Sequence, residues 1–361
     1  MQRRHFIGLS GAAALAVAAG LPRSAAHAQA AYSAVDLGLP EGFESVVPVA
    51  LNNQSVAVVS ASSSNGLGVF LVENGVFTQL GEPDETAYPA AINDANQVGG
   101  WITGASDGSS PPEDIPMLFT STGQVELPGS RLVGRVYALG VEGEAVGEAA
   151  IDEKHAARRA VIWDNQEVVE LKGAPGEGAS AARDNNGLGQ VVGRNGNDDG
   201  SQRKAVLFSL DADPVELGTL GGALSEAVAI SEQGMIVGNS STSDEQTSLI
   251  GNGTAAYSWM DGTLSALHTL EHQVWSSAAD VSSFGLVVGT VGIGAPDADS
   301  TATTAVVWAP DAVLDLNQII QPIEGLTLTA AVAINELGQV LCTAVDPAGG
   351  SRAVLLSVLG N

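Results

Sequence analysis

The chain has 361 residues, with 14 Lys and Arg against 41 Asp and Glu, 44 Gly and a single Cys. One cysteine excludes an intramolecular disulfide framework and any zinc site built from several cysteines. A formal charge of −27 argues against a nucleic-acid partner, because phosphate binding needs a basic surface. The hydrophobic fraction of 45% is enough for a large core, so an acidic disordered chain is excluded as well.

Residues 1–30 have the three parts of a secretory signal: a charged start, an apolar run and a small-residue stretch. Arg3 and Arg4 resemble the paired arginines of the twin-arginine export type, and residues 26–30 offer two A-x-A cleavage positions. The run is too short and too rich in Ala and Gly to favour a retained anchor, and no later apolar stretch reaches the about 20 residues of a membrane helix. We therefore expect a periplasmic or secreted protein without a membrane span.

One short motif recurs along the rest of the chain: a small residue, an apolar residue, a polar turn and a second apolar stretch. Ala-Ile-Asn-Asp-Ala-Asn-Gln-Val-Gly at 91–99 and Ala-Ile-Ser-Glu-Gln-Gly-Met-Ile-Val-Gly at 229–238 are two copies. Because Gly accepts the positive φ that tight hairpins require, each copy predicts two strands joined by a turn. The turn position recurs every 47 residues on average, at Ser55, Asn96, Gly143, Gly189, Gly234, Gly285 and Gly338.

A second motif alternates with the first at the same period. It is an apolar stretch, such as Ala160-Val-Ile-Trp163, that is followed in most copies by a polar turn and a short segment ending near Leu-Gly. Each unit thus predicts four strands, and no segment has the 3.6-residue apolar spacing of a long helix. The stretches of this second motif end at Phe70, Phe119, Trp163, Phe208, Trp259, Trp308 and Leu356.

Units of four strands and about 40 to 50 residues are typical of propeller blades. Seven units account for residues 31–361, so the sequence predicts a single domain, an all-β seven-bladed propeller. The last unit lacks a fourth strand, and the segment 32–38 ends in the Leu-Gly that closes other units. We expect this N-terminal strand to close the last blade, which would leave no long unpaired edge. An open solenoid would need capping units, which the chain lacks.

These residues resemble a family. Glu216-Leu-Gly-Thr-Leu-Gly-Gly222, followed by Ser225-Glu-Ala-Val-Ala-Ile230 and Gly234-Met-Ile-Val-Gly238, is similar to the bacterial extracellular HAF repeat. The resemblance covers essentially all of the chain after the leader, although the His-Ala-Phe triplet itself is missing from every copy. It implies export and repetition, and it implies no reaction and no catalytic residues.

Two segments resemble metal sites. His268-Thr-Leu-Glu271-His272 matches the H-x-x-E-H pattern of one class of zinc proteases, which requires a helix; here the segment aligns with the linker between two units, so a solvent-facing linker is favoured. Asn195, Asn197 and Asp199 resemble the first half of a calcium loop, but the closing acidic ligand is missing. Calcium is thus the only cofactor suggested, and a plain hairpin loop is the alternative.

Cys342 stands where four other copies have Gly after the second strand of the unit. It has no second cysteine to pair with, and the only histidines after residue 30 are His155, His268 and His272. We therefore interpret Cys342 as a small packed residue and not as a nucleophile.

The charges are distributed unevenly. Ten basic and 12 acidic residues lie in the window 131–204, whereas the rest of the chain after residue 30 has one basic residue, Arg352, and 29 acidic residues. In a propeller the inter-blade linkers and the loops between second and third strands share one face, so this window predicts a basic sector on blades three and four. Such a sector can hold an anionic ligand, since Arg pairs with carboxylate or phosphate in a bidentate manner; the alternative is that the cations only neutralise neighbouring carboxylates. The candidate ligand-binding residues are Arg131, Arg135, Lys154, Arg158, Arg159, Arg194, Arg203 and Lys204.

The preferred function is a non-enzymatic binding propeller that uses the face with the longer loops, with an unknown partner such as an anionic glycan. The alternatives are a propeller hydrolase or lyase acting on a sugar or lactone, and a passive structural component of the envelope. The first strand of each unit should line the central channel of the ring. The small residues of these strands do not provide the converging titratable groups that a catalytic centre needs. The expected lining residues are Ala90, Ala138, Ala181, Ala227, Ala278 and Ala331.

Overall fold

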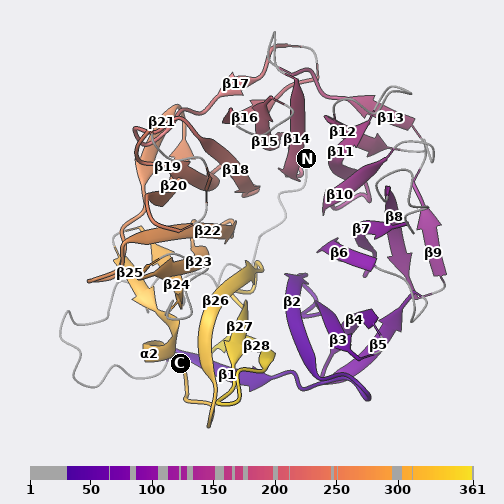
Figure 1. The fold of residues 1–361 in the computed structure, drawn as a ribbon, viewed down its shortest axis with the longest axis vertical. Coiled ribbons are helices and arrows are strands. Elements are labelled where there is room, and N and C mark those ends of the chain that lie inside the picture. Colours follow the sequence, from indigo (N-terminus) through magenta and orange to yellow (C-terminus); the bar gives the residue numbers. More distant parts are fainter. Residues whose placement is uncertain are drawn as a thin grey trace, which may run out of the picture.

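The computed structural model describes residues 31–359, apart from residues 65, 82–86, 105–112, 122, 128–132, 151–157, 165–166, 174–177, 198–201, 211, 245–247, 250, 295–302 and 311. Within this part of the chain, seven four-stranded antiparallel sheets form a ring (Figure 1). The protein is therefore a seven-bladed β-propeller, as its repeats predict. The only helix of the described residues is α2 (Leu316–Ile319), a single turn between blades six and seven. No helix in the described ranges is long and apolar enough to cross a membrane.

Each blade runs from the innermost to the outermost strand in chain order, and blade seven takes its outermost strand from the N-terminus. Blades one to three consist of β2 (Ser45–Leu51), β3 (Ala57–Ser63), β4 (Gly66–Glu73) and β5 (Val76–Leu80); β6 (Ala87–Ile92), β7 (Val98–Thr103), β8 (Asp114–Thr120) and β9 (Gly123–Glu126); and β10 (Gly134–Leu139), β11 (Ala145–Ala150), β12 (Arg158–Asp164) and β13 (Glu167–Glu170). Blades four to six consist of β14 (Ala179–Asn185), β15 (Val191–Gly196), β16 (Arg203–Phe208) and β17 (Val215–Glu216); β18 (Ser225–Ile230), β19 (Ile236–Ser241), β20 (Thr254–Met260) and β21 (Thr263–Ala266); and β22 (Trp275–Val281), β23 (Val287–Gly292), β24 (Thr303–Ala309) and β25 (Ala312–Asp315). Blade seven consists of β26 (Thr327–Ile334), β27 (Val340–Val345), β28 (Ser351–Val358) and the N-terminal β1 (Tyr32–Asp36).

The recurring turn joins the first and second strands of every blade. All seven predicted turn positions have a positive φ, including the non-glycine residues Ser55 at 66° and Asn96 at 59°. An asparagine that precedes the turn explains its shape: Asn93 Oδ1 accepts hydrogen bonds from the backbone N–H groups of Ala95 and Gln97, at 3.1 and 3.0 Å. The polar residues of the repeat thus satisfy the backbone of their own turn.

The same asparagines connect neighbouring blades. Asn335 Nδ2 donates to the backbone oxygen of Asn52 (2.9 Å), and Asn52 Nδ2 donates to that of Asn93 (3.1 Å). Asn186 Nδ2 makes the corresponding bond to Ser231 at 3.0 Å. One side chain therefore shapes a turn and ties it to the next blade, which is a physical reason for Asn at this position of the repeat.

The hydrophobic core lies between neighbouring blades of the ring. Each of the seven clusters of buried apolar side chains joins two neighbouring blades, as where Val58 and Leu71 of blade one meet Val98 and Phe119 of blade two. A buried serine on the first strand adds a polar contact at three of these seams: the hydroxyls of Ser180, Ser225 and Ser276 accept from the backbone N–H of Ala160, Ala205 and Ala256, respectively.

The ring is closed by the N-terminal strand, as the sequence predicts. β1 pairs antiparallel with β28 over its whole length, with Tyr32 opposite Val358 and Asp36 opposite Val354. Tyr32 is 5% exposed and packs in the core between blades six and seven. This pairing covers the edge that blade seven would otherwise leave open.

Two faces follow from the strand order. The connections between second and third strands and the inter-blade linkers lie on one face, which we call the loop face. The short turns between first and second strands lie on the opposite face. Much of the longer loops expected to carry function, including 105–112, 151–157 and 295–302, falls outside the described residues.

Candidate functional site

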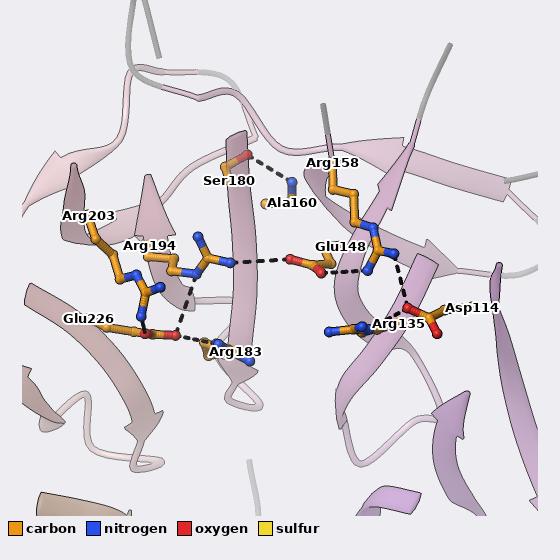
Figure 2. Close-up of polar contacts among 10 residues, drawn as sticks. All are labelled: Asp114, Arg135, Glu148, Arg158, Ala160, Ser180, Arg183, Arg194, Arg203 and Glu226. Carbon is orange, nitrogen blue, oxygen red and sulfur yellow. Dashed lines mark hydrogen bonds and ion pairs between the residues drawn. The ribbon is translucent and has the colours of Figure 1, made fainter. Parts of the chain in front are cut away.

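Five arginines and three carboxylates from blades two to five form one continuous set of ion pairs, which we call the arginine cluster (Figure 2). First and third strands begin at the loop face and second strands end there. Most of the cluster residues lie at these ends of their strands. The cluster consists of Asp114 on β8, Arg135 on β10, Glu148 on β11, Arg158 on β12, Arg183 on β14, Arg194 on β15, Arg203 on β16 and Glu226 on β18.

One half of the cluster joins blades two and three. Asp114 Oδ2 lies 2.7 Å from Nε of Arg135 and 3.0 Å from a terminal nitrogen of Arg158. The other terminal nitrogen of Arg158 lies 3.0 Å from Glu148 Oε1, so this guanidinium bridges two carboxylates. The side chains of Asp114 and Glu148 are each only 7% exposed, which leaves the arginines as the solvent-facing members.

The other half centres on Glu226 of blade five. Its carboxylate pairs with Arg183 at 2.5 Å, with Arg203 at 3.1 Å and with Arg194 at 3.6 Å. Arg194 also reaches Glu148 of blade three, at 3.5 Å, and so connects the two halves. The Glu226 side chain is 9% exposed, whereas those of Arg183 and Arg203 are 27% and 30% exposed.

The electrostatics hold Asp114 and Glu226 in their charged form. Burial by itself would raise the pKa of Asp114, but hydrogen bonds from Thr103, Arg158 and Arg135 outweigh it and the pKa lies below its ordinary value. Glu226 behaves likewise, because three guanidinium groups outweigh its burial and lower its pKa. With five arginines on three carboxylates, the cluster keeps two positive charges in excess, on a protein whose formal charge is −27.

Four of the eight candidate residues belong to the cluster: Arg135, Arg158, Arg194 and Arg203. Arg158 lies directly after the loop between the second and third strands of blade three, as expected, whereas Arg135 lies on β10 and not in the inter-blade linker expected from the sequence. Arg159 and Lys204 lie beside cluster members, but their side chains have other partners: Arg159 Nε is 4.0 Å from Glu170, and Lys204 donates to the backbone oxygen of Ala223 at 2.9 Å. Successive side chains of a strand point to opposite sides, so neighbours in sequence separate in space. Arg131 and Lys154 lie outside the described residues.

Sequence reasoning missed Arg183, which contributes to both the cluster and the channel. Each first strand has a register shift, a β-bulge, where it pairs with the second strand, and Arg183 is the extra residue in blade four. A bulge changes the direction of one side chain and interrupts the alternation of inward- and outward-facing residues. A search for period-two alternation in the sequence therefore does not predict that Arg183 faces the channel. The extra residues at the equivalent bulges are Val49, Ala90, Tyr137, Val228, Ala279 and Val332.

These seven bulge residues line the central channel, together with the residues that follow them. The expected alanine lining is thus partly wrong: Ala90 and Ala138 do line the channel, but Ala181, Ala227, Ala278 and Ala331 are buried between blades. The bulge shifts which residues face inward, because the extra residue takes the channel position. The side chains at the bulges are nevertheless small and apolar in five blades, and only Tyr137 and Arg183 are large or polar.

A row of ring contacts connects Tyr88 and Trp101 of blade two to Tyr137 and Arg183. Tyr88 stacks on Trp101 with ring centroids 5.4 Å apart, and Trp101 meets Tyr137 edge-on at 6.0 Å. The Arg183 guanidinium lies 4.2 Å from the centroid of Tyr137. Each such contact is favourable, so this row of contacts holds the Arg183 head group in place at the channel wall.

Two carboxyl groups also line the channel, Asp184 and Asp280. Each accepts the backbone N–H of its own successor and one from the next blade: Ile230 N to Asp184 and Ile334 N to Asp280, both at 2.8 Å. Burial raises the pKa of Asp184 to about 8 and that of Asp280 to about 7, and the backbone hydrogen bonds offset only part of this shift. These groups tie neighbouring first strands together across the inner edge.

The predicted calcium loop is only partly described. Asn195 lies on β15 and is 1% exposed, and its side-chain amide has no hydrogen-bond partner among the described residues. Asn197 Oδ1 accepts the backbone N–H of Gln202 at 2.7 Å and so shapes the loop, whereas Asp199 lies outside the described residues. The calcium site stays a prediction.

The H-x-x-E-H segment is an inter-blade linker, as the sequence favours. It lies between β21 and β22 without helical structure; the His268 backbone oxygen accepts from Trp308 Nε1, and the His272 side chain is 86% exposed. Among the described residues no group of three His, Cys, Asp or Glu side chains is placed to hold a metal ion. Cys342 is buried in the core between blades six and seven, where burial raises the pKa of its thiol.

Comparison with known proteins supports the fold. No family model and no curated protein matches the chain. Among solved structures it is similar to streptogramin B lyase, with a TM-score of 0.50, 10% identity and coverage of 92% of this chain and 100% of that one. It is also similar to the β-propeller domain of the Trilobed protease from Pyrococcus furiosus (TM-score 0.46, 13% identity, 76% and 86% covered) and to Trypanosoma rangeli sialidase, solved with sialic acid (0.44, 13%, 92% and 58%). At 10% identity the likeness to streptogramin B lyase shows the fold alone.

Proposed function

We propose that this propeller is an exported, non-enzymatic binding protein that takes an anionic ligand at the arginine cluster. The proposal rests on the arginine cluster, in which five arginines surround three buried carboxylates. This leaves an excess of two positive charges at the loop face of an otherwise acidic molecule. Guanidinium groups fixed by buried acids are already oriented, so little side-chain entropy is lost when a carboxylate or phosphate binds.

The proposal of export rests on the leader-like residues 1–30 and on the resemblance to the HAF repeat. An extracellular or periplasmic propeller with a cationic sector has a natural class of partner in anionic glycans and their breakdown products. The strongly acidic remainder of the surface repels extended polyanions, which favours a small ligand over a charged polymer.

Binding is preferred to catalysis because the cluster acids are already occupied. Asp114 and Glu148 each contact two arginines, and Glu226 contacts three. Carboxylates that are held in ion pairs with this many guanidinium groups have no free oxygen positioned to exchange a proton with a substrate, so they are poor general acids or bases. Binding is preferred to a passive structural role because an excess of partly exposed arginines adds nothing to the stability of an envelope scaffold.

The experiment is calorimetric titration of the purified protein with inorganic phosphate, succinate and D-glucuronate, beside Arg158→Gln and Arg203→Gln. We expect at least one probe to bind and the Kd to rise about tenfold in each variant, because each loses a charged donor. Arg352→Gln, which removes an arginine from blade seven on the same face, is the control and should bind like the wild type. The proposal fails if no probe binds, or if Arg352→Gln weakens binding as much as the cluster variants.

A further inference from the structure

The central channel contains a cavity of about 280 Å³ that is lined by first-strand residues from all seven blades. About nine water molecules would fill it, at about 30 Å³ each, so its size suits a ligand of roughly a dozen heavy atoms. The walls are mostly small, with alanines such as Ala50, Ala91 and Ala229. The cavity is therefore wide because the repeat places small side chains there.

One wall of this cavity is cationic. Arg183 lines it and is held from two sides, by the ion pair with Glu226 and by the Tyr137 ring. Tyr137 lines the same wall, and its neighbour Arg135 belongs to the arginine cluster. A carboxylate placed against this wall would meet the Arg183 guanidinium, which the ion pair with Glu226 and the contact with the Tyr137 ring hold in place.

The rest of the lining combines small apolar side chains with the carboxyl groups of Asp184 and Asp280 and with backbone groups of the first strands. The first strands are the innermost strands of their sheets, so one edge of each has no partner strand and its backbone groups face inward. The carboxyl groups of Asp184 and Asp280 take up two of these backbone N–H groups, from Ile230 and Ile334. A ligand that fills the cavity must replace water on several such groups, which hydroxyl groups do and hydrocarbon does not.

Resting on the function proposed above, we propose that the channel cavity binds a small hydroxylated monocarboxylate, such as a hexuronic acid, with its carboxylate on Arg183 beside the Tyr137 ring. The arginine cluster at the loop face attracts the anion, and Arg183 connects the cluster to the cavity. The small bulge residues of the other blades set the size limit. The ligand is a single acidic sugar and not a chain, because the cavity holds about one ring.

Ala279→Tyr tests the location of the bound ligand. Ala279 is the bulge residue of blade six, equivalent to Tyr137 of blade three, so the repeat already accommodates tyrosine at this backbone position. The variant fills the cavity and leaves every arginine of the cluster in place. We expect the Kd for D-glucuronate to rise at least about tenfold. Ala348→Tyr, the same change at an exposed loop residue of blade seven, should leave it unchanged.

The chemical class is tested with three probes of similar size: D-glucuronate, D-glucose and cyclohexanecarboxylate. We expect only glucuronate to bind well, since glucose lacks the charge and cyclohexanecarboxylate lacks the hydroxyls. Fluorescence of Trp101, which contacts Tyr137, gives a second readout, and it should disappear in Trp101→Phe.

The outcomes separate this inference from the proposed function. Unchanged glucuronate binding by a folded Ala279→Tyr overturns the cavity site while binding at the cluster stands. Equal binding of cyclohexanecarboxylate and glucuronate overturns the assignment to a hydroxylated ligand. Failure of the wild type to bind any anion overturns both proposals.

Discussion

Two parts of the ring are held together by different forces. Between blades six and seven, the described residues include 17 buried apolar side chains, among them Tyr32 of the closing strand. Among the residues that the structure describes, the three seams from blade two to blade five have 6, 8 and 7 such side chains, and these are the seams that the arginine cluster crosses. The remaining three seams have nine each in the same part of the chain.

The difference shows that the repeat fixes the backbone of each blade, whereas the side chains that fill the seam between two blades can differ from one seam to the next. Glu148 and Arg194 occupy the same place in their blades, directly after the Gly of the second strand, and Asn239 follows Gly238 in the same way. This position therefore accepts a carboxylate, a guanidinium or an amide without a change in strand pairing. Ion pairs stabilise less than apolar burial, which fits a region kept for binding and not for stability.

The largest expected effect is at the apolar seam. Tyr32→Ala should lower the free energy of unfolding by about 3–4 kcal/mol, because a buried aromatic side chain leaves a cavity where the ring closes. Val35→Ala on the same strand, at a residue 57% exposed, should change it by less than about 0.5 kcal/mol. Urea unfolding followed by circular dichroism measures both. Equal losses would show that the closing strand acts only through its backbone pairing.

A smaller effect is expected at the ionic seams. Glu226→Gln keeps the shape of the side chain but leaves three arginines without a shared carboxylate, so we expect a loss of about 2 kcal/mol after allowance for their partial exposure. Glu216→Gln, at an exposed residue of β17, is the control and should be nearly neutral. The same urea measurement applies. A neutral Glu226→Gln would mean that solvent already screens the cluster.

The last prediction concerns the dependence of stability on pH. Asp280 keeps its proton in the folded state up to about pH 7, whereas in the unfolded chain it loses the proton near pH 4, so its contribution to stability falls as the pH rises between these values. Asp280→Asn removes this loss, and its Tm relative to the wild type should therefore rise from pH 5 to pH 8. The lowered pKa values of Asp114 and Glu226 act in the opposite sense, since their stabilisation is lost as the pH falls through the acid range. A Tm difference independent of pH would contradict the assignment.

Much of the fold follows from local sequence. The seven turn positions all have positive φ, and the strand ending in Leu-Gly before the first unit does complete the last blade. The candidate site was predictable only in outline: composition indicated a basic window on blades three and four, but alternation along the strands excluded Arg159 and Lys204 from the cluster. Arg183 could not be found, because a bulge in the first strand decides where its side chain points.

The amino-acid sequence alone determined the number of blades, the turns and the closing strand, since each depends on residues within one unit or on a count of units. Tertiary structure decided which charges meet, because Asp114, Glu148 and Glu226 come from three different blades and are joined only when the ring brings their seams side by side. It also decided what lines the channel, since the bulges shift the inward-facing residues by one position in every blade. Side-chain direction at a bulge depends on pairing with a neighbouring strand, and that pairing exists only in the folded sheet.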